Sequence, residues 1–526
     1  MPFRGKCVAA FMLCLFFLSG CALAWEIAEP LPTPRAGVRE IESVVPEADP
    51  ANIPLETALF REGEGALSAV SFGNAAEYTR YIEGVSTFRG SNYRQNAAYG
   101  TIPENPSLLS AIWSISVGGY GPWSGVGWTG QPAIVRWDDA TKGIMNLEAS
   151  KKEKENLKEV IYAALDGKIR FLDLDDGTPT REAISVGAPI KGSVTVDPRG
   201  YPLLYCGQGI QVVNGVRKPI GFRAFSLIDQ MQLLFIDGVD DLAPRGWYAF
   251  DGACLVDAGT DTLFEVGENG VFYRVALNTA YDAAKGTIAL DPDIDRYTWK
   301  SENISRLGAE SSVAIYNRYA YFADNAGLLQ CVDLNAMRCV WAVLTGDDTD
   351  ATCAIEETDS AVSLYTGNEI EHRGNRGKCN LRKFDALTGA LIWQHDISVS
   401  NNTYGGLFAS PVVGESGLSE LVFFNVSCTS ENGTLFALDK ETGEVRWSLG
   451  LGRYSWSSPV ALYTQSGKGY LVVCDSMGIV RLVDGEDGAV LCALDLGRNI
   501  EGSPAAYDDM LVIGTRGGRI YGVKVS

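Results

Sequence analysis

Short stretches with strict alternation of apolar and polar residues characterise the chain from about residue 108 onward. In residues 435–450, LFALDKETGEVRWSLG, one alternating stretch is followed by a polar turn from Asp439 to Gly443 and then by a second alternating stretch. A period of two predicts β-strands, and a polar turn that ends in glycine predicts a hairpin. The pattern therefore predicts an all-β protein built from short antiparallel strands.

The same hairpin recurs at a regular interval. Its members are Asp173 with Gly177, Asp333 with Trp341, Asp385 with Gly389 and Trp393, Asp439 with Gly443 and Trp447, and Asp484 with Gly488. The last four aspartates lie 52, 54 and 45 residues apart, which is the length of one four-stranded propeller blade. We expect the repeated aspartates to accept backbone N–H bonds within their turns, and the tryptophans to be buried between blades.

Ser-Pro pairs mark where each repeat begins. Ser410-Pro411, Ser458-Pro459 and Ser503-Pro504 each precede an apolar run, and proline is tolerated at the first residue of a strand. The last repeat ends after its third strand, and residues near 108–117, with Trp113, have the pattern of the missing fourth strand. We therefore predict an eight-bladed β-propeller of four-stranded antiparallel blades over residues 86–526, closed by an N-terminal strand.

The repeat motif resembles that of a known family. Ala437, Asp439, Thr442, Gly443 and Trp447 form an A-x-D-x-x-T-G-x-x-x-W pattern that resembles the repeat of the quinoprotein alcohol dehydrogenase-like propellers. Residues 86–100 and 189–209 are similar to segments of PQQ-like repeat proteins secreted by Gram-positive bacteria. The resemblance implies eight blades with tryptophans wedged between them. It does not select a function, because the family includes PQQ-dependent dehydrogenases and the propeller lipoprotein of outer-membrane protein assembly.

The N-terminus predicts export. Arg4 and Lys6 precede the apolar run VAAFMLCLFFLSGCALA, so residues 1–20 are interpreted as a signal peptide. The sequence LSGC resembles a lipobox in which Cys21 is lipidated, whereas Ala22-Leu23-Ala24 offers an ordinary signal-peptidase site as the alternative. Residues 21–85 are interpreted as a tether rich in Pro and Glu followed by an N-terminal extension. We expect a protein anchored by lipid to the outer face of the cell membrane, or a secreted one.

Composition and charge argue against several classes of partner and of catalytic or metal site. A formal net charge of −21 over 526 residues argues against nucleic acid as a partner and leaves a lipid anchor as the one membrane contact. The chain has only two histidines, which argues strongly against a His-based triad or a multi-histidine metal site. Cys331 and Cys339 face each other across one predicted hairpin, as a disulfide or as two thiols. The acidic loops 291–295 and 346–350 lack EF-hand spacing and are interpreted as solvated.

No redox cofactor is predicted, with PQQ and Ca²⁺ as the alternative. The family resemblance implies a quinone held between a tryptophan and a ring of two adjacent cysteines, beside Ca²⁺ bound by Glu, Asn and Asp. This sequence has no Cys-Cys dipeptide and no haem-attachment motif C-x-x-C-H. The family's metal ligands match no segment of the chain.

A ligand site is expected on one face of the ring. The connections between blades emerge on the same face as the loops between second and third strands. These segments carry Tyr120, Trp123, Trp128, Tyr404, Arg453, Tyr454, Trp456, Arg498 and Asn499. Such side chains suit sugar rings or extended peptides, although they also suit the covering of blade interfaces. We predict a monomeric, non-catalytic binding or scaffolding protein for a glycan, peptide or envelope protein; the alternatives are a PQQ-dependent oxidoreductase and a purely structural envelope component.

Overall fold

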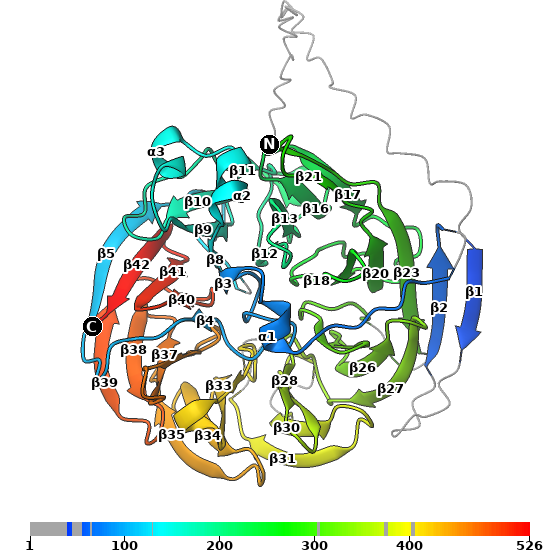
Figure 1. The fold of residues 1–526 in the computed structure, drawn as a ribbon. Helices are drawn as coiled ribbons and strands as arrows, with labels where there is room; N and C mark the ends of the chain where they lie inside the picture. Colours follow the sequence, from blue (N-terminus) through cyan, green and yellow to red (C-terminus); the bar gives the residue numbers. More distant parts are fainter. Residues whose placement is uncertain are drawn as a thin grey trace, which may run out of the picture. The chain divides into compact units, whose positions relative to one another are not determined.

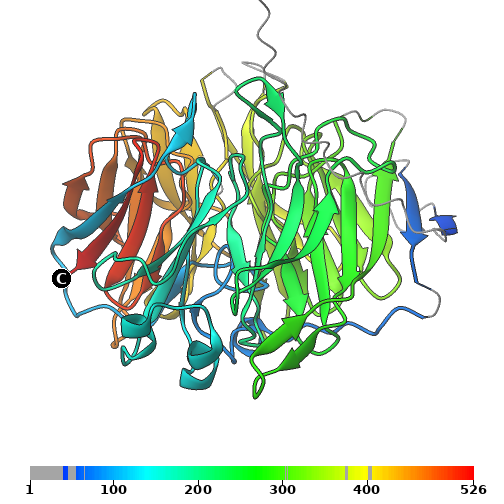
Figure 2. The same cartoon turned by 90° about the horizontal axis from the view of Figure 1, so that it is seen from above.

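Eight sheets surround one axis in the computed structural model (Figure 1). It describes residues 55–63, 66–128, 130–301, 304, 306–372, 377–400 and 405–526, and the backbone of 39–44. The strands of each blade run side by side through the thickness of the disc (Figure 2). The predicted all-β, eight-bladed propeller is confirmed. Within the described part of the chain, helices are too short and too polar to cross a membrane.

Each blade has four strands, which are named below from the innermost to the outermost. Blade 1 contains β8 (Ala133–Arg136), β9 (Lys158–Ala163), β10 (Lys168–Asp173) and β11 (Ile184–Ser185), and blade 2 contains β12 (Val194–Val196), β13 (Leu203–Cys206), β16 (Gly221–Ser226) and β17 (Gln232–Asp237). Blade 3 contains β18 (Leu255–Asp257), β19 (Thr262–Val266), β20 (Val271–Ala276) and β23 (Asp293–Lys300), and blade 4 contains β24 (Ala314–Tyr316), β25 (Tyr319–Ala323), β26 (Leu328–Asp333) and β27 (Arg338–Leu344). Blade 5 contains β28 (Ala354–Glu357), β29 (Val362–Gly367), β30 (Cys379–Asp385) and β31 (Leu391–Ile397), and blade 6 contains β32 (Val412–Val413), β33 (Leu421–Ser427), β34 (Gly433–Asp439) and β35 (Val445–Gly450). Blade 7 contains β36 (Val460–Tyr463), β37 (Gly469–Cys474), β38 (Ile479–Asp484) and β39 (Val490–Asp495), and blade 8 contains β40 (Ala505–Tyr507), β41 (Met510–Thr515), β42 (Arg519–Val525) and β5 (Leu109–Ser116).

Smaller elements decorate this ring. They are the hairpins β6 (Gly119–Tyr120) with β7 (Trp123–Ser124), β14 (Val212–Val213) with β15 (Val216–Arg217), and β21 (Ala280–Asp282) with β22 (Thr287–Ala289), and the helices α1 (Ala75–Tyr78), α2 (Asp139–Ile144), α3 (Ala149–Lys152) and the 3₁₀ turn η2 (Ser416–Leu418). Helix α1 begins with a capping box, in which the Asn74 side chain accepts from the Glu77 backbone N–H and the Glu77 carboxylate accepts from the Asn74 backbone N–H.

The ring closes through its N-terminal part, as predicted. Strand β5 pairs antiparallel with β42 from Leu109 opposite Val525 to Ser116 opposite Arg519. The chain therefore begins and ends in the same blade, and β42 is not left with an open edge.

The repeated tryptophans lock neighbouring blades together. Their indole Nε1 atoms donate to a carbonyl of the next blade's turn, Trp113 to Leu174 at 2.7 Å, Trp341 to Ala386 at 3.0 Å, Trp393 to Lys440 at 2.9 Å and Trp447 to Gly485 at 3.1 Å. Each ring lies against the turn's glycine, where a Cβ atom would overlap the indole. The repeated aspartate shapes the same turn, since the Asp439 carboxylate accepts from the backbone N–H groups of Glu441 and Thr442. The motif therefore encodes the blade interface.

Burial of these tryptophans varies between blades. Trp341 is 1% exposed and Trp393 is 8% exposed, whereas Trp447 is half-buried and packs against the core of blades 6 and 7. No residue of β35 is fully buried, so this outer strand is more exposed than β27 and β31. Trp447 is therefore the least covered of the three.

Part of the predicted tether and extension (21–85) is built into the sheets. Strand β2 (Glu56–Arg61) pairs with the outer strand of blade 3, and β1 (Arg39–Val44) pairs with β2. Strand β3 (Glu83–Val85) pairs with β8 on the inner side of blade 1. An edge strand offers a row of backbone groups to a further strand, which is why this extension can add to the blades. Residues 1–38, including Cys21 and the signal region, lie outside the described residues.

Residues 86–97, which we call the plug, form hydrogen bonds with all eight blades. Carbonyl oxygens of the plug accept hydrogen bonds from the Gln131 side chain and from the backbone N–H groups of Val196, Ile315, Ile355, Val413 and Ala506. In the opposite direction, Arg94 of the plug donates to Ala253 O at 2.6 Å, and Asn96 donates to Ala461 O at 2.8 Å. Arg89 donates to Pro459 O at 2.6 Å and to Pro411 O at 3.1 Å, and both arginines are fully buried. Burial lowers the pKa of Arg94 to about 10. Strand β4 (Ala98–Tyr99) follows and pairs in parallel with β40. The plug therefore ties the inner strands together at the face where α1 crosses the ring (Figure 1).

Candidate binding site at the mouth of the propeller axis

A belt of hydroxyl groups surrounds the axis where the innermost strands begin. Side-chain oxygens of Ser193, Ser312, Thr352, Ser410, Ser458 and Ser503 each accept from a backbone N–H of the preceding blade, at 2.8 to 3.1 Å. Between blades 8 and 1, Ser503 N–H donates to Gly130 O at 2.9 Å. The Ser-Pro pairs seen in the sequence are therefore part of this belt.

One side chain per blade lies two residues before the belt position. These equivalent positions, which we call the axial ring, are Lys191, Asp251, Glu310, Asp350, Phe408, Trp456 and Glu501, in the order of blades 2 to 8. The position in blade 1 is residue 129, outside the described residues. Three consecutive acids follow a lysine, and two consecutive aromatic residues follow the acids. The mouth of the axis therefore has an acidic arc on blades 3 to 5 and an aromatic arc on blades 6 and 7.

The acidic arc continues into the loops after each second strand. Glu268 and Glu369 occupy this loop in blades 3 and 5, and Asp348 precedes Asp350 by two residues. All of these carboxylates are buried, with Glu369 only 2% exposed. Lys191 pairs with Asp251 and lies 3.3 Å from Glu310, and Arg245 lies 3.3 Å from Glu268. The arc therefore gathers six carboxyl groups around two cations.

Burial and mutual repulsion disturb the ionisation of this arc. Burial, together with the charge of Glu310, raises the pKa of Asp350 to about 8. Burial raises the pKa of Asp251 to about 6 even though Lys191 acts in the opposite direction. Burial and neighbouring acids also raise the pKa values of Glu268 and Glu369 well above their usual range. Part of the arc therefore holds protons near neutral pH.

Replacing Asp350 by asparagine should stabilise the protein at alkaline pH. A carboxyl group whose pKa rises from 3.8 to about 8 on folding makes stability fall as pH increases through this window. We expect Asp350→Asn to raise the free energy of unfolding at pH 8.5 by about 2 kcal/mol, well under the ceiling of roughly 6 kcal/mol that such a shift sets. At pH 4 the difference should vanish. Denaturant unfolding at both pH values measures it.

Asp439→Asn is the control for this result. Backbone N–H bonds from the Asp439 turn hold the pKa of that carboxyl below its usual value, so its stabilising contribution is present above about pH 4 and is lost as pH falls. This variant should therefore melt earlier than the parent at pH 8.5. An equal effect of both substitutions would contradict the assignment of uncompensated charge to Asp350.

The aromatic arc brings together residues from four blades. The Phe408 and Trp456 rings stack with centroids 4.9 Å apart, Trp128 meets Phe408 edge-on at 5.8 Å, and Tyr454 lies 5.4 Å from Trp456. The Asn499 side chain donates to the Tyr454 hydroxyl at 3.3 Å. Trp128, Tyr454 and Trp456 are half-buried, so the arc keeps part of its surface open to solvent.

The remaining residues expected at the site are distributed around it. Tyr120 and Trp123 pair with each other across the β6–β7 hairpin. Arg453 and Arg498 are exposed, Arg453 donating to Gly452 O and Arg498 packing against Gly517. Tyr404 lies outside the described residues.

One interpretation of the sequence was wrong, and one alternative that the sequence left open is decided by the structure. Residues 346–350 were expected to be a solvated loop, but Asp348 and Asp350 are buried in the acidic arc because this segment leads directly into an innermost strand. Of the two alternatives for Cys331 and Cys339, the structure shows two thiols. A β-bulge at Val340 in β27 places Cys339 opposite Val332 and Trp341 opposite Cys331, so the two sulfur atoms do not face each other.

Sequence reasoning missed most of the axial ring. Lys191, Asp251, Glu310 and Phe408 had no motif of their own, and Trp247, which is 45% exposed and donates to Glu268, was also missed. The signal was present in the repeat register, because each axial-ring residue stands two positions before a Ser or Thr of the hydroxyl belt, or before Ala253 in blade 3.

The acidic arc fits a cation better than it fits a quinone. Carboxylate oxygens are ligands that Ca²⁺ accepts, and Asp251, Glu268 and Glu310 offer oxygens within 4.8 Å of one another. The quinone platform implied by the family has no counterpart, because no two cysteines are adjacent in the sequence. The chemistry of the donor set is therefore that of a cation site.

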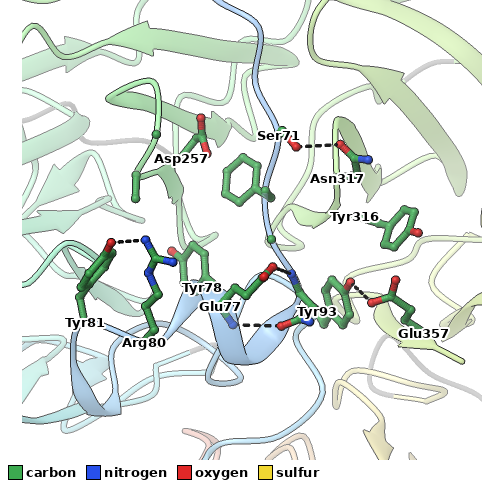
Figure 3. A pocket seen from close by; sticks show the side chains of 15 residues that line it. Ser71, Glu77, Tyr78, Arg80, Tyr81, Tyr93, Asp257, Tyr316, Asn317 and Glu357 are labelled. Carbon is green, nitrogen blue, oxygen red and sulfur yellow. Dashed lines mark hydrogen bonds between the residues drawn. The ribbon is translucent and has the colours of Figure 1, made fainter.

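A second hollow, of about 500 Å³, lies on the opposite face (Figure 3). Asp257, Tyr316 and Glu357 end the first strands of blades 3 to 5, and α1 and the plug complete the walls. Its polar groups already bond to one another, with Tyr93 donating to Glu357 at 2.6 Å and Ser71 to Asn317 at 3.3 Å. This internal pairing makes it a weaker candidate than the axial ring.

Comparisons with known proteins agree with the propeller. The family model PQQ_2, described as outer membrane protein assembly factor BamB, matches residues 284–466, about a third of the chain. No curated protein matches. Among solved structures, quinohemoprotein alcohol dehydrogenase ADHIIG from Pseudomonas putida HK5 superposes with a TM-score of 0.58 at 12% identity, covering 88% of this chain and 83% of that one.

Two further structures superpose less closely. BamB from Moraxella catarrhalis has a TM-score of 0.48 at 14% identity, covering 79% of this chain and all of that one, and the computationally designed Ika8 protein has 0.46 at 10% identity, covering 82% and 99%. The dehydrogenase likeness, at 12% identity, shows a shared fold alone. The chain is thus an eight-bladed β-propeller with PQQ-like repeats, whose residues 284–466 match the family model of BamB.

Proposed function

We propose that this protein is an exported, non-catalytic binding protein that holds a segment of an envelope protein, or a glycan, at the mouth of its axis. The observation that supports this is the axial ring, which sets a partly open aromatic arc beside a buried acidic arc. Half-exposed aromatic rings next to convergent polar groups are typical of ligand sites.

The N-terminal sequence and the family match support an envelope location. The apolar run before Cys21 has the pattern of an export signal, and the family model that matches residues 284–466 is described by a protein of outer-membrane assembly. Lipidation of Cys21 would hold the propeller at a membrane surface through a chain anchor alone. The mass of the N-terminal peptide, with acyl chains on Cys21 or with a free N-terminus after Ala24, tests this part of the proposal.

The competing function is that of a PQQ-dependent dehydrogenase. The acidic arc is the one feature that favours this function. A quinone enzyme needs a cation beside its cofactor to polarise the reacting carbonyl, and the carboxylates of the arc could hold a cation. The sequence opposes it, because the adjacent cysteines that hold the quinone are absent. The aromatic arc is then a surface for a ligand and not one wall of a cofactor cage.

The purified protein should neither retain PQQ nor oxidise substrates. When PQQ, Ca²⁺ and an artificial electron acceptor are supplied, it should show no dye reduction with alcohols or aldose sugars and no quinone absorbance after gel filtration. Stoichiometric quinone binding, or dye reduction abolished by a chelator, would contradict the proposed function.

A further inference from the structure

We propose that the acidic arc binds a primary ammonium group, supplied by a lysine side chain of a partner protein or by a small polyamine. The inference rests on the proposed binding function and names the chemistry of its ligand. The axial-ring positions Asp251, Glu310 and Asp350 would surround the ammonium group, and the aromatic arc would lie beside the rest of the ligand.

The first support is an imbalance of buried charge. The six carboxyl groups of the arc are Asp251, Glu268, Glu310, Asp348, Asp350 and Glu369. The basic groups beside them are Lys191, Arg245 and His372, whose ring Nε2 lies 3.8 Å from Asp348. Buried carboxylates are normally paired, and unpaired ones take up protons. A cation that entered the arc would replace those protons and recover the Coulomb energy of the ionised groups.

The second support is a set of carboxylate oxygens without partners. Asp348 Oδ1, Asp350 Oδ1 and Glu369 Oε1 are buried and accept no hydrogen bond from the described residues. All three come from blade 5, where the Asp350 carboxyl group interacts with those of Asp348 and Glu369, and the charge of Glu310 in blade 4 acts on each of them. They therefore lie together beside Glu310 of the neighbouring blade.

The number of open acceptors matches an ammonium group. A lysine-type ammonium group has three N–H donors and no acceptor, so it can satisfy three carboxylate oxygens at once. A buried acceptor without a hydrogen bond destabilises the protein, because it has lost its bond to water. A hydrogen bond from a charged donor such as an ammonium group removes this penalty.

Lys191 already shows that this environment accepts an alkylammonium group. Its ammonium group pairs with Asp251 and lies 3.3 Å from Glu310, while its aliphatic chain reaches there from blade 2. The field of the acidic neighbours raises the pKa of Lys191 well above its usual value in spite of its burial. A second ammonium group on the blade 5 side would repeat this arrangement.

Lys191 also favours a monovalent ligand over a divalent metal ion. A divalent ion beside the fixed Lys191 ammonium would meet twice the repulsion that a monovalent ion meets. The half-exposed indole of Trp247 donates to Glu268, so its ring lies beside the arc and is available to a passing cation. Aromatic faces add attraction for organic cations in particular.

Calorimetric titration of residues 22–526 tests the proposal. The probes are an N-acetylated, C-amidated tripeptide Ala-Lys-Ala, the same peptide with Nε-acetyl-lysine, cadaverine, and Ca²⁺. We expect the peptide or the diamine to bind and the Nε-acetyl peptide to show no binding. Asp350→Asn and Glu369→Gln should each weaken binding by about tenfold or more, as expected for a buried charge pair. Binding of the peptide without cadaverine indicates a protein partner, and the converse indicates a polyamine.

Glu356→Gln is the matched control. Glu356 lies in β28 of blade 5, outside the axial ring, and its carboxylate already pairs with Lys440 at 2.6 Å and accepts from the Tyr365 hydroxyl at 2.6 Å. Its replacement should change the affinity by less than about twofold, since a charge with a partner has little left to offer a ligand. Cooperative melting of every variant verifies that the propeller is intact.

Three results would overturn the inference. They are equal binding of the free and Nε-acetylated lysine peptides, unchanged affinity in Asp350→Asn, and stoichiometric Ca²⁺ binding to a protein that binds no amine. None of them restores dehydrogenase activity, so failure of the ammonium site is distinguishable from failure of the proposed function, which would appear as quinone retention.

Discussion

A chain lacking residues 86–118 should aggregate and should show no cooperative unfolding transition. This deletion removes strand β5, which pairs with β42 along its whole length, and it removes the plug. An unclosed propeller exposes the edge of β42 and the first face of blade 1, and it loses the hydrogen bonds that tie the inner strands to the plug. Size-exclusion chromatography and calorimetric melting measure the outcome.

The control for this deletion is a chain that lacks residues 22–54. These residues precede β2, so the eight blades, the plug and β5 all remain. We expect this variant to stay monomeric and to melt within a few degrees of the parent, because it keeps the packed core of the ring. A deletion of 86–118 that behaved like this control would show that the N-terminal strand does not close the ring in solution.

Trp341→Ala should lower the free energy of unfolding by roughly 3–5 kcal/mol, the usual cost of emptying a large aromatic site. Trp341 is 1% exposed, packs against Gly389 of blade 5 and donates to Ala386 O at 3.0 Å. The substitution leaves a cavity between blades 4 and 5 and an unpaired carbonyl group. Urea unfolding followed by fluorescence of the remaining tryptophans gives the value.

Two further substitutions separate the parts of this effect. Trp341→Phe keeps an aromatic ring but loses the indole N–H, so it should cost less than Trp341→Ala. Trp447→Ala should also cost less, because the ring of Trp447 is half-buried although its hydrogen bond to Gly485 is of the same kind. Equal losses for Trp341→Ala and Trp447→Ala would show that the hydrogen bond, and not the buried surface, dominates the interface.

The axial ring shows how a repeat can build a site that no single repeat contains. Each blade contributes one side chain at the same position, so the site is assembled only when the blades are arranged around the axis. Neighbouring blades then set the electrostatic environment of each group, as Glu310 does for Asp350. A change in one repeat alters the site locally while the belt of hydroxyl groups keeps the inner strands in register.

Much of the fold was predictable because its signals are local and repeated. The spacing of Asp439, Gly443 and Trp447 predicted the hairpin, and its recurrence predicted the blades. The missing strand of the last repeat predicted closure by the segment around Trp113, which the pairing of β5 with β42 confirms. The sequence pattern did not reveal features that depend on neighbouring strands, such as the lesser burial of Trp447 and the bulge in β27 that sets Cys331 and Cys339 apart.

The sequence by itself determined the class of strand, the number of blades, the structural role of the repeated motif and the absence of a cysteine pair for a quinone. Only the tertiary structure decided that residues 86–97 form hydrogen bonds with every blade, and that Asp251, Glu310 and Asp350 stand on consecutive blades with Asp251 and Asp350 buried. The physical reason is the distance along the sequence over which each interaction acts. Strand alternation and turn chemistry act over a few residues, whereas the charge of Asp350 depends in part on Glu310 and Lys191, 40 and 159 residues away, which the arrangement of the blades brings beside it.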